Sequence, residues 1–193
     1  ITFIAQPTAE AGPETTICET GGVIDVENTV AEPATNYSQL EWTIVDGSTF
    51  GTINNANTLS PEFIPAADAV TQGFVTLQLT VYPTNHSTCD QTSGLCCGVA
   101  TDTVRVNIQK EPVILIPSNQ EICQNDTFTI FNDQVQIENI PSYTIQWTHD
   151  GAGVLTNSDT LTPTYTPTVS ETGDVTLTIS ITPANPNVCT GLD

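Results

Sequence analysis

The sequence predicts an all-β fold built of tandem two-sheet sandwich modules. Two observations support this: a set of residues recurs at an offset of about one hundred positions, and apolar residues alternate with polar ones over short stretches. A period of that size is too long for a solenoid repeat and matches a whole small domain. Period-two alternation is the pattern of half-buried strands. We therefore expect an array of similar modules rather than one large core.

The repeat consists of framework residue types. It pairs Ile17-Cys18 with Ile122-Cys123, Trp42 with Trp147, Asp46-Gly47 with Asp150-Gly151, Pro61-x-Phe63-x-Pro65 with Pro163-x-Tyr165-x-Pro167, and Val75-Thr76-Leu77 with Val175-Thr176-Leu177. The same offset places Ile1-Thr2-Phe3-Ile4 on the closing stretch of the first repeat. The expected modules are therefore residues 1–5, the last strand of a preceding module, then 6–110, and then 111–193, which lacks its final strand. We expect these residues to belong to a longer polypeptide.

The longest alternating stretch covers residues 74–82. Val75, Leu77, Leu79 and Val81 share one face, and the stretch 175–181 repeats the pattern. About seven short strands per module predict an immunoglobulin-like sandwich, and no segment has the 3.6-residue periodicity of a helix. The two Asp-Gly pairs predict tight hairpins.

Each module has one tryptophan, Trp42 or Trp147, in the middle of an expected strand. Sandwiches of this kind often bury a core tryptophan on a central strand, and a sugar-stacking platform is the competing interpretation. The Pro-x-aromatic-x-Pro box predicts an extended, rigid segment, because proline fixes φ and biases its predecessor towards extended conformations.

The chain has 22 acidic and 2 basic residues, which gives a net charge of −20 at pH 7. Nucleic acid and anionic membrane surfaces are therefore unsuitable partners, since both need a basic face. No apolar run is long enough to span a bilayer. The two histidines, His86 and His149, do not repeat, and no catalytic motif occurs. We expect no enzyme, no catalytic residue and no cofactor.

Calcium is the one metal that the composition makes worth testing, because oxygen ligands are abundant. The acidic positions are Asp25, Asp68, Asp102, Asp150 and Asp174. The Asp-x-Asp-x-Asp-Gly spacing of a dedicated calcium loop is missing, so we expect these carboxylates to be solvated.

Six cysteines at partly repeating positions predict disulfides formed in an oxidising compartment. The expected pairs are Cys18–Cys97, Cys89–Cys96 and Cys123–Cys189. The alternative is Cys18–Cys89 with a vicinal Cys96–Cys97 bridge. A metal site is the competing interpretation, but no Cys-x-x-Cys spacing or histidine cluster is present.

The junction between the modules, residues 108–113, contains no glycine or serine, and Pro112 stiffens it. A flexible tether is therefore not expected. The neighbouring modules of the same chain are the first expected partners. Lys110, the only lysine, lies in this junction, so a Lys–Asn cross-link within each module is not expected.

The whole chain resembles the repeat modules of giant Bacteroidetes gliding-motility adhesins of the SprB type, whose modules are PKD-like and immunoglobulin-like sandwiches. The residues that carry the resemblance are Ala9-Glu10-Ala11-Gly12-x-x-x-Thr16-Ile17-Cys18, Trp42-Thr43, the Pro-x-aromatic-x-Pro box, the Val-Thr-Leu strand, and Cys97-Gly98-x-x-x-Asp102-Thr103. The second repeat departs from this pattern at Ser118-Asn119-Gln120.

This resemblance implies a long extracellular filament at the cell surface, exported by type IX secretion and attached to the outer-membrane gliding machinery. It also implies contact with extracellular polysaccharide, and O-glycans at Thr103 and Thr160, which follow aspartate and precede apolar residues. The alternative function is a secreted carbohydrate-binding module, which needs exposed aromatic residues such as Tyr37, Tyr82 and Tyr143. No two of these three tyrosines match at the repeat offset.

Overall fold

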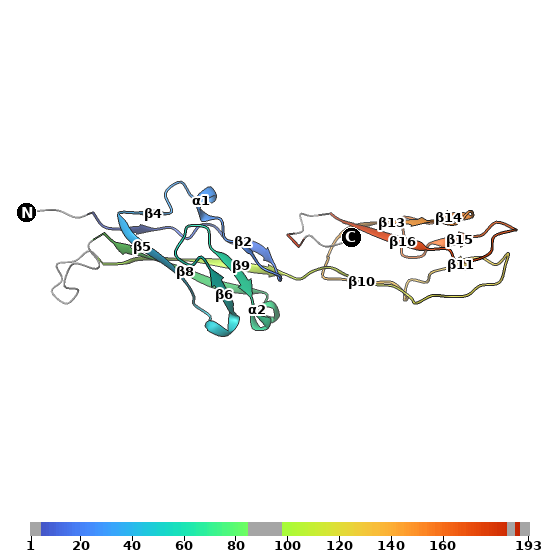
Figure 1. Ribbon diagram of the computed structural model, residues 1–193, viewed down its shortest axis with the longest axis horizontal. Helices are drawn as coiled ribbons and strands as arrows, with labels where there is room; N and C mark the ends of the chain where they lie inside the picture. Colours follow the sequence, from blue (N-terminus) through green and yellow to red (C-terminus); the bar gives the residue numbers. More distant parts are fainter. Residues whose placement is uncertain (1–4, 85–97, 185–187, 190–193) are drawn as a thin grey trace, which may run out of the picture. The chain divides into compact units, whose positions relative to one another are not determined.

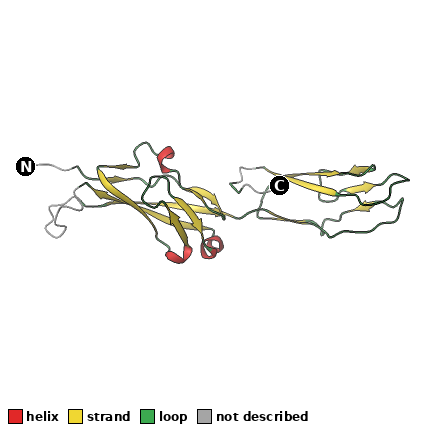
Figure 2. Cartoon of the chain, viewed as in Figure 1, coloured by secondary structure: helices red, strands yellow, loops and turns green. Residues whose placement is uncertain are grey.

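The computed structural model describes residues 5–84, 98–184 and 188–189. The chain divides into two compact units, residues 1–110 (unit 1) and 111–193 (unit 2), and each is described by itself. Figure 1 labels most of their elements, and Figure 2 shows that strands dominate both.

The described residues of unit 1 contain nine strands in three sheets. Its strands are β1 (Thr8–Ala9), β2 (Thr15–Cys18), β3 (Gly22–Val23), β4 (Ala34–Thr35), β5 (Tyr37–Ile44), β6 (Gly51–Asn54), β7 (Glu62–Pro65), β8 (Phe74–Pro83) and β9 (Ala100–Gln109). The sheet orders are β2-β9-β8-β5, β3-β7-β6 and β1-β4. The alternation of residues 74–82 is confirmed, because Val75, Leu77, Leu79 and Val81 are all fully buried.

Strand β9 lies in the middle of the four-stranded sheet. It pairs antiparallel with β8, where Val75 faces Val106, and parallel with β2, where Thr15 faces Val106. Its alternate residues Val104, Val106 and Ile108 enter the main core, together with Trp42 and Phe63. Both edges of β9 are thus occupied, and its apolar face closes the core of unit 1.

The Pro-x-aromatic-x-Pro box forms strand β7, the central strand of the second sheet. Phe63 is fully buried there, and Pro61 accepts a hydrogen bond from the amide of Ile24. The prediction of an extended segment is confirmed, and the box is itself a strand of the framework.

Unit 1 also contains short helices, which the sequence pattern did not predict. They are α1 (Val26–Thr29), the 3-10 turn η1 (Ser48–Phe50) and α2 (Ala67–Gln72). The Asp25 carboxylate caps α1 by accepting from the amide of Asn28, and Gly73 ends α2 at φ 82°. Helices α1 and α2 are each set by a cap and one buried side chain, Val26 or Ala69, so they leave no periodic signal.

The hairpins predicted at Asp46-Gly47 and Asp150-Gly151 are wrong. In unit 1 the chain leaves β5 and crosses to β6 in the sheet β3-β7-β6, while β5 pairs with β8. The Asp46 carboxylate accepts a hydrogen bond from the amide of Thr76 on β8, and Asp150 accepts one from Thr176 in the same way. The aspartate therefore fixes a crossover between sheets instead of a two-residue turn.

The described residues of unit 2 repeat seven of these strands. They are β10 (Val113–Leu115), β11 (Phe128–Thr129), β12 (Gln136–Glu138), β13 (Tyr143–His149), β14 (Val154–Thr156), β15 (Thr164–Thr166) and β16 (Leu177–Pro183). They form the sheets β13-β16, β11-β15-β14 and β10-β12. Within the described residues of unit 2, no strand corresponds to β2 or β9 and no helix occurs.

The core of unit 2 is smaller. Its buried cluster consists of Ile130, Val135 and Trp147, with half-buried neighbours that include Leu177 and Ile179. In the described part of the whole chain, no helix has the length and apolar character that a membrane crossing requires.

Candidate functional site

The tryptophan of each unit is a structural residue. Trp42 and Trp147 are both 2% exposed. The indole N–H of Trp42 donates to the carbonyl of Thr58, and that of Trp147 donates to the carbonyl of Thr160, each at 3.0 Å. A buried indole with its donor satisfied cannot offer a face to a sugar ring. The core interpretation therefore holds, and the stacking interpretation is excluded for both residues.

A glycine packed on an aromatic ring is a second shared feature. A Cβ at Gly51 would meet the carbonyl oxygen of Ile64 and the ring of Phe63. Gly153 stands in the same relation to the carbonyl oxygen of Thr166 and the ring of Tyr165. Each unit therefore depends on this glycine, because no larger residue fits over the ring.

Unit 2 adds polar chemistry to this framework, in what we call the Tyr165 cluster: His149, Asp150, Tyr165 and Glu171. The Tyr165 hydroxyl donates to Glu171 Oε1 at 2.6 Å and accepts from the amide of Gly153 at 2.8 Å. Glu171 also accepts from the amides of Ala152 at 2.8 Å and Thr168 at 2.9 Å. This carboxylate thus ties two loops to one phenol.

The ionisation of the cluster follows from these contacts. The hydrogen bond from Tyr165 lowers the pKa of Glu171, and backbone amides lower it further. Desolvation raises the pKa of Tyr165, and the neighbouring Glu171 adds to the effect. The amide of Thr176 lowers the pKa of Asp150. These shifts favour ionised Glu171 and Asp150 and a neutral Tyr165, which are the protonation states that keep these hydrogen bonds in place.

His149 lies at the edge of the cluster. Its ring is 5.0 Å from that of Tyr165, with an angle of 59° between the planes. Its Nδ1 atom is buried and has no hydrogen-bond partner among the described residues. Both oxygens of Glu171 accept from Tyr165 or from backbone amides, and neither is hydrogen-bonded to His149. The arrangement therefore positions loops and contains no paired acid and base.

Sequence reasoning missed this cluster because it treated Tyr165 as a framework aromatic residue and Glu171 as one surface acid among many. A signal existed. At an offset of 102, Phe63 becomes Tyr165 and the buried Ala69 of α2 becomes Glu171. The two changes are complementary, because the new hydroxyl meets the new carboxylate.

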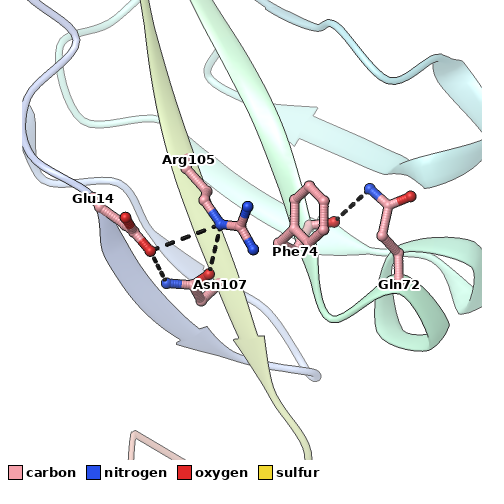
Figure 3. A network of polar contacts seen from close by, with 5 residues as sticks. All are labelled: Glu14, Gln72, Phe74, Arg105 and Asn107. Carbon is pink, nitrogen blue, oxygen red and sulfur yellow. Dashed lines mark hydrogen bonds and ion pairs between the residues drawn. The ribbon is translucent and has the colours of Figure 1, made fainter.

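The polar network of unit 1 surrounds Arg105 on β9 (Figure 3). Arg105 Nε lies 3.7 Å from Glu14 Oε1 and donates to Asn107 Oδ1 at 3.1 Å, while Asn107 donates to the same Glu14 oxygen at 2.6 Å. The guanidinium also lies 3.7 Å from the centroid of the Phe74 ring. Both charged side chains are about half exposed, at 49% and 59%, so the network holds neighbouring strands at the surface.

The acidic residues considered for calcium are placed separately. Asp25 caps α1, Asp68 lies in the first turn of α2, and Asp102 accepts from the amide of Ala11 at 2.7 Å. Asp150 belongs to the Tyr165 cluster, and Asp174 is exposed in the loop before β16. Among the described residues, no three His, Cys, Asp or Glu side chains come together as a metal site.

The cysteines require one correction. Cys18 and Cys189 are disulfide-bonded, whereas Cys123 carries a free, exposed thiol. The expected Cys123–Cys189 pair is therefore wrong. Cys18 ends β2, which pairs with β9, but residues 120–123 form no strand, so nothing draws Cys123 into a core. Cys89, Cys96 and Cys97, like His86, lie outside the described residues.

Both candidate glycosylation sites are exposed. Thr103 is on β9. Thr160 closes a turn by donating from its hydroxyl to the carbonyl of Asn157 at 2.9 Å, as Thr58 does to Asn55 in unit 1. The hydroxyl of Thr160 thus has a framework role that an attached glycan would disturb.

The tyrosines proposed for carbohydrate contact show an unexpected equivalence. Tyr37 faces Pro83 across β5 and β8, and Tyr143 faces Pro183 across β13 and β16. A bulge in β5 between Tyr37 and Gln39 shifts the repeat by one residue, which hid this match in the sequence. Tyr82 points to the other face, where its hydroxyl donates to Glu41. Tyr37 and Tyr143 are therefore equivalent in the two units, so the prediction that these tyrosines do not repeat is wrong for this pair.

No protein-family model matches the chain, and no curated protein matches it. Among solved structures, the eight N-terminal immunoglobulin domains of the Down syndrome cell adhesion molecule are similar to it, with 11% sequence identity and a TM-score of 0.53 over 94% of this chain and 27% of that one. A PKD domain from the KIAA 1837 protein gives 16% identity and a TM-score of 0.37, over 62% of this chain and 99% of that one. The human desmocollin-1 ectodomain gives 10% identity and a TM-score of 0.35, over 99% of this chain and 38% of that one.

Because the sequence identity is 11%, the similarity to the domains of the Down syndrome cell adhesion molecule shows the fold alone. This chain spans 27% of that structure. Together with the strand pairing within each unit, the comparison establishes immunoglobulin-like β-sandwiches.

Proposed function

We propose that this chain is a repeat segment of a long extracellular filamentous adhesin and serves as its stalk. One observation carries the proposal: among the described residues, the two units share framework contacts, and neither of the two larger polar networks is repeated. Trp42 and Trp147 make the same hydrogen bond, whereas the Tyr165 cluster and the Arg105 network occur once each. A repeated binding function would need repeated chemistry, and the repeated element here is mechanical framework.

Further features support a surface location. Disulfide-bonded Cys18 and Cys189 indicate an oxidising compartment. A net charge of −20 keeps neighbouring filaments apart in solution. The assignment to gliding motility, type IX secretion and an outer-membrane partner follows from the sequence resemblance and belongs to the proposal. Contact with extracellular polysaccharide and glycans on Thr103 and Thr160 belong to it as well, and a glycan on Thr160 would replace the hydrogen bond from its hydroxyl to the Asn157 carbonyl.

The connection between the units supports a stiff stalk. Strand β9 ends at Gln109 and β10 begins at Val113, so only three residues, Lys110 to Pro112, join the two frameworks. A linker this short that contains proline and lacks glycine has few accessible conformations.

Stiffness can be tested by measuring distances between spin labels placed at Thr52 and Thr156, which are exposed on β6 and β14. We expect a narrow distance distribution in the parent chain. The matched control changes Lys110, Glu111 and Pro112 to glycine, and it should broaden the distribution without changing either unit. A distribution as broad in the parent as in the control would contradict the stalk proposal.

A carbohydrate-binding module is the second candidate, and the equivalence of Tyr37 and Tyr143 favours it. Each lies opposite the proline that ends the long strand, and Tyr37 is 38% exposed. A glycan array of the whole chain tests it, with Tyr37→Ala and Tyr143→Ala as variants. Binding that both variants weaken would support this candidate. Binding at background level would leave the stalk as the function of the segment.

A further inference from the structure

Both units have a proline directly before the first strand that the structure describes, and an asparagine faces it. Pro7 precedes β1, and Pro112 precedes β10. Strand β1 pairs antiparallel with β4, and continuing its register by one residue places Asn36 opposite Pro7. The register of β10 with β12 places Asn139 opposite Pro112 in the same way. Because proline has no N–H group, it cannot donate a hydrogen bond to the facing strand.

The pairing continues instead through the side chain of the asparagine. Nδ2 of Asn36 donates to the carbonyl of Gln6 at 2.9 Å, and Nδ2 of Asn139 donates to the carbonyl of Glu111 at 2.8 Å. Each acceptor belongs to the residue before the proline. Asn36 and Asn139 have φ values of 54° and 62°, in the left-handed region that asparagine tolerates better than most residues. We call this repeated contact the entry clamp of each unit.

The entry clamp of unit 2 lies directly after the end of β9. Gln109, the last residue of β9, is held within unit 1, because its carbonyl accepts from the amide of Glu19 at 2.8 Å. The carbonyl of Glu111 is held within unit 2 by Asn139. Only the backbone torsions of Lys110 and Glu111 lie between these two bonded carbonyls. The torsional freedom of the junction is therefore confined to two residues.

The same two residues form the one peptide bond that trypsin can reach outside a paired strand. Trypsin cleaves after lysine and arginine, and the chain has one of each, Lys110 and Arg105. Arg105 lies on β9, which pairs with β8 and with β2. Lys110 is exposed and follows the end of that strand. Cleavage between Lys110 and Glu111 therefore reports local opening of the junction.

We propose that the entry clamp of unit 2 protects the junction from proteases that cleave after lysine. Such a protease binds several residues on both sides of the cleaved bond, so the backbone after Lys110 has to leave its own partners first. The hydrogen bond from Asn139 to Glu111 is the first of these partners to break. The clamp acts whether or not the chain serves as a stalk, because donor and acceptor both belong to unit 2.

The test follows cleavage of the full chain by trypsin under native conditions, with mass spectrometry of the fragments 1–110 and 111–193. Asn139→Gly removes the donor and keeps the backbone conformation, because glycine adopts positive φ readily. The loss of one exposed hydrogen bond should increase the population of the open junction. We expect cleavage after Lys110 to become about three- to tenfold faster.

Two matched variants isolate the clamp. Asn157→Gly changes another asparagine of unit 2 with a left-handed φ, 55°, and should leave the cleavage rate unchanged. Asn36→Gly removes the equivalent clamp of unit 1, which holds Gln6, and should also leave cleavage after Lys110 unchanged. A second measurement needs no variant: the side-chain amide protons of Asn139 should exchange with solvent about three- to tenfold more slowly than those of blocked asparagine.

Three results would overturn the proposal. One is an equal cleavage rate in the parent chain and in Asn139→Gly. Another is an acceleration of the same size in Asn157→Gly, because added glycine flexibility would then be the cause. The third is unprotected side-chain amide protons at Asn139 in the parent chain. A broad spin-label distance distribution together with the expected cleavage rates would contradict the stalk and support the clamp.

Discussion

The two units follow one plan and differ in how well it is closed. In unit 1, β9 lies between β8 and β2 and completes a core that includes Trp42, Phe63 and the inward face of β8. In unit 2, the described residues contain no strand in that position, and the buried cluster reduces to Ile130, Val135 and Trp147. The difference teaches that the closing strand, rather than the tryptophan or the proline box, decides how much apolar surface leaves water.

Unit 2 holds the segment after β15 with hydrogen bonds instead of a packed helix. Unit 1 fixes the segment after β7 with helix α2, whose Ala69 is fully buried. Unit 2 has no helix there; Glu171 holds the loop by accepting from Tyr165 and from the amides of Ala152 and Thr168. Packing thus anchors the loop in one unit, and charge-assisted hydrogen bonds anchor it in the other.

The largest expected effect comes from truncating matched leucines. Leu77→Ala should lower the free energy of unfolding of unit 1 by about 3 kcal/mol, because the side chain is fully buried and a cavity remains. Leu177→Ala should cost unit 2 about half as much, since its side chain is only half-buried. Each unit has one tryptophan, so denaturant melts of the chain labelled with 5-fluorotryptophan report the unfolding of each unit by its own fluorine signal. These melts measure both losses of free energy. Equal costs would mean that the closing strand does not control burial.

The matched glycines should behave alike. Gly51→Ala and Gly153→Ala each force a Cβ against a backbone carbonyl and an aromatic ring, so each should destabilise its own unit by about 2 kcal/mol. Gly98→Ala is the control, because no atom of the described residues lies within 4 Å of its added Cβ. Hydrogen exchange resolved by peptide mass spectrometry should show each loss confined to one unit. A loss in only one of the two variants would show that the ring contact is not a shared framework element.

Acidification should lower the stability of the two units at different pH values. Glu171 and Asp150 have lowered pKa values in the folded chain, so they stabilise unit 2 above their ordinary values of 4.5 and 3.8. This stabilisation is lost as the pH falls from those values through the lower folded pKa values. We expect unit 2 to lose stability before unit 1 below about pH 4.5.

A Glu171→Gln variant tests the cause. It keeps the shape of the side chain and removes the charge, so unit 2 should start less stable at pH 7 and show a flatter decline with acid. The Glu27→Gln variant is the control, because Glu27 is an exposed residue of α1 in unit 1. An unchanged acid profile in Glu171→Gln would exclude this carboxylate as the source.

The smallest effect concerns the Arg105 network. Arg105→Gln should lower the free energy of unfolding of unit 1 by about 0.5 kcal/mol, because both partners are about half exposed. The difference between parent and variant should shrink at 1 M salt, where charges are screened within about 3 Å. A loss that salt leaves unchanged would assign the effect to the contact with the Phe74 ring instead.

Alternation and repetition predicted much of the fold. The buried faces of β8, the core positions of Trp42 and Trp147, and the extended proline box were all readable, because a period of two and a matched aromatic residue are local signals. The hairpins at Asp46-Gly47 and Asp150-Gly151 were not. An Asp-Gly pair indicates a turn, but the strand that receives the next segment is chosen by long-range pairing.

The candidate sites were harder to predict. The Tyr165 cluster joins residues from strands β13 and β15 and from the loops that follow them, and its members look ordinary in isolation. The match between Tyr37 and Tyr143 was hidden by one bulged residue in β5. The Cys123 thiol is free because the stretch before it forms no strand, which depends on pairing rather than on spacing.

The sequence by itself determined that this protein is built of two similar β-sandwich units with a common apolar framework, because side-chain alternation and buried aromatic residues are encoded locally. The tertiary structure decided which edges are closed, which carboxylates serve as ties and which thiol stays free. Those outcomes depend on partners far apart in the chain. The physical reason is that a strand's apolar face is buried only when a neighbour covers it, and the identity of that neighbour is a property of the fold.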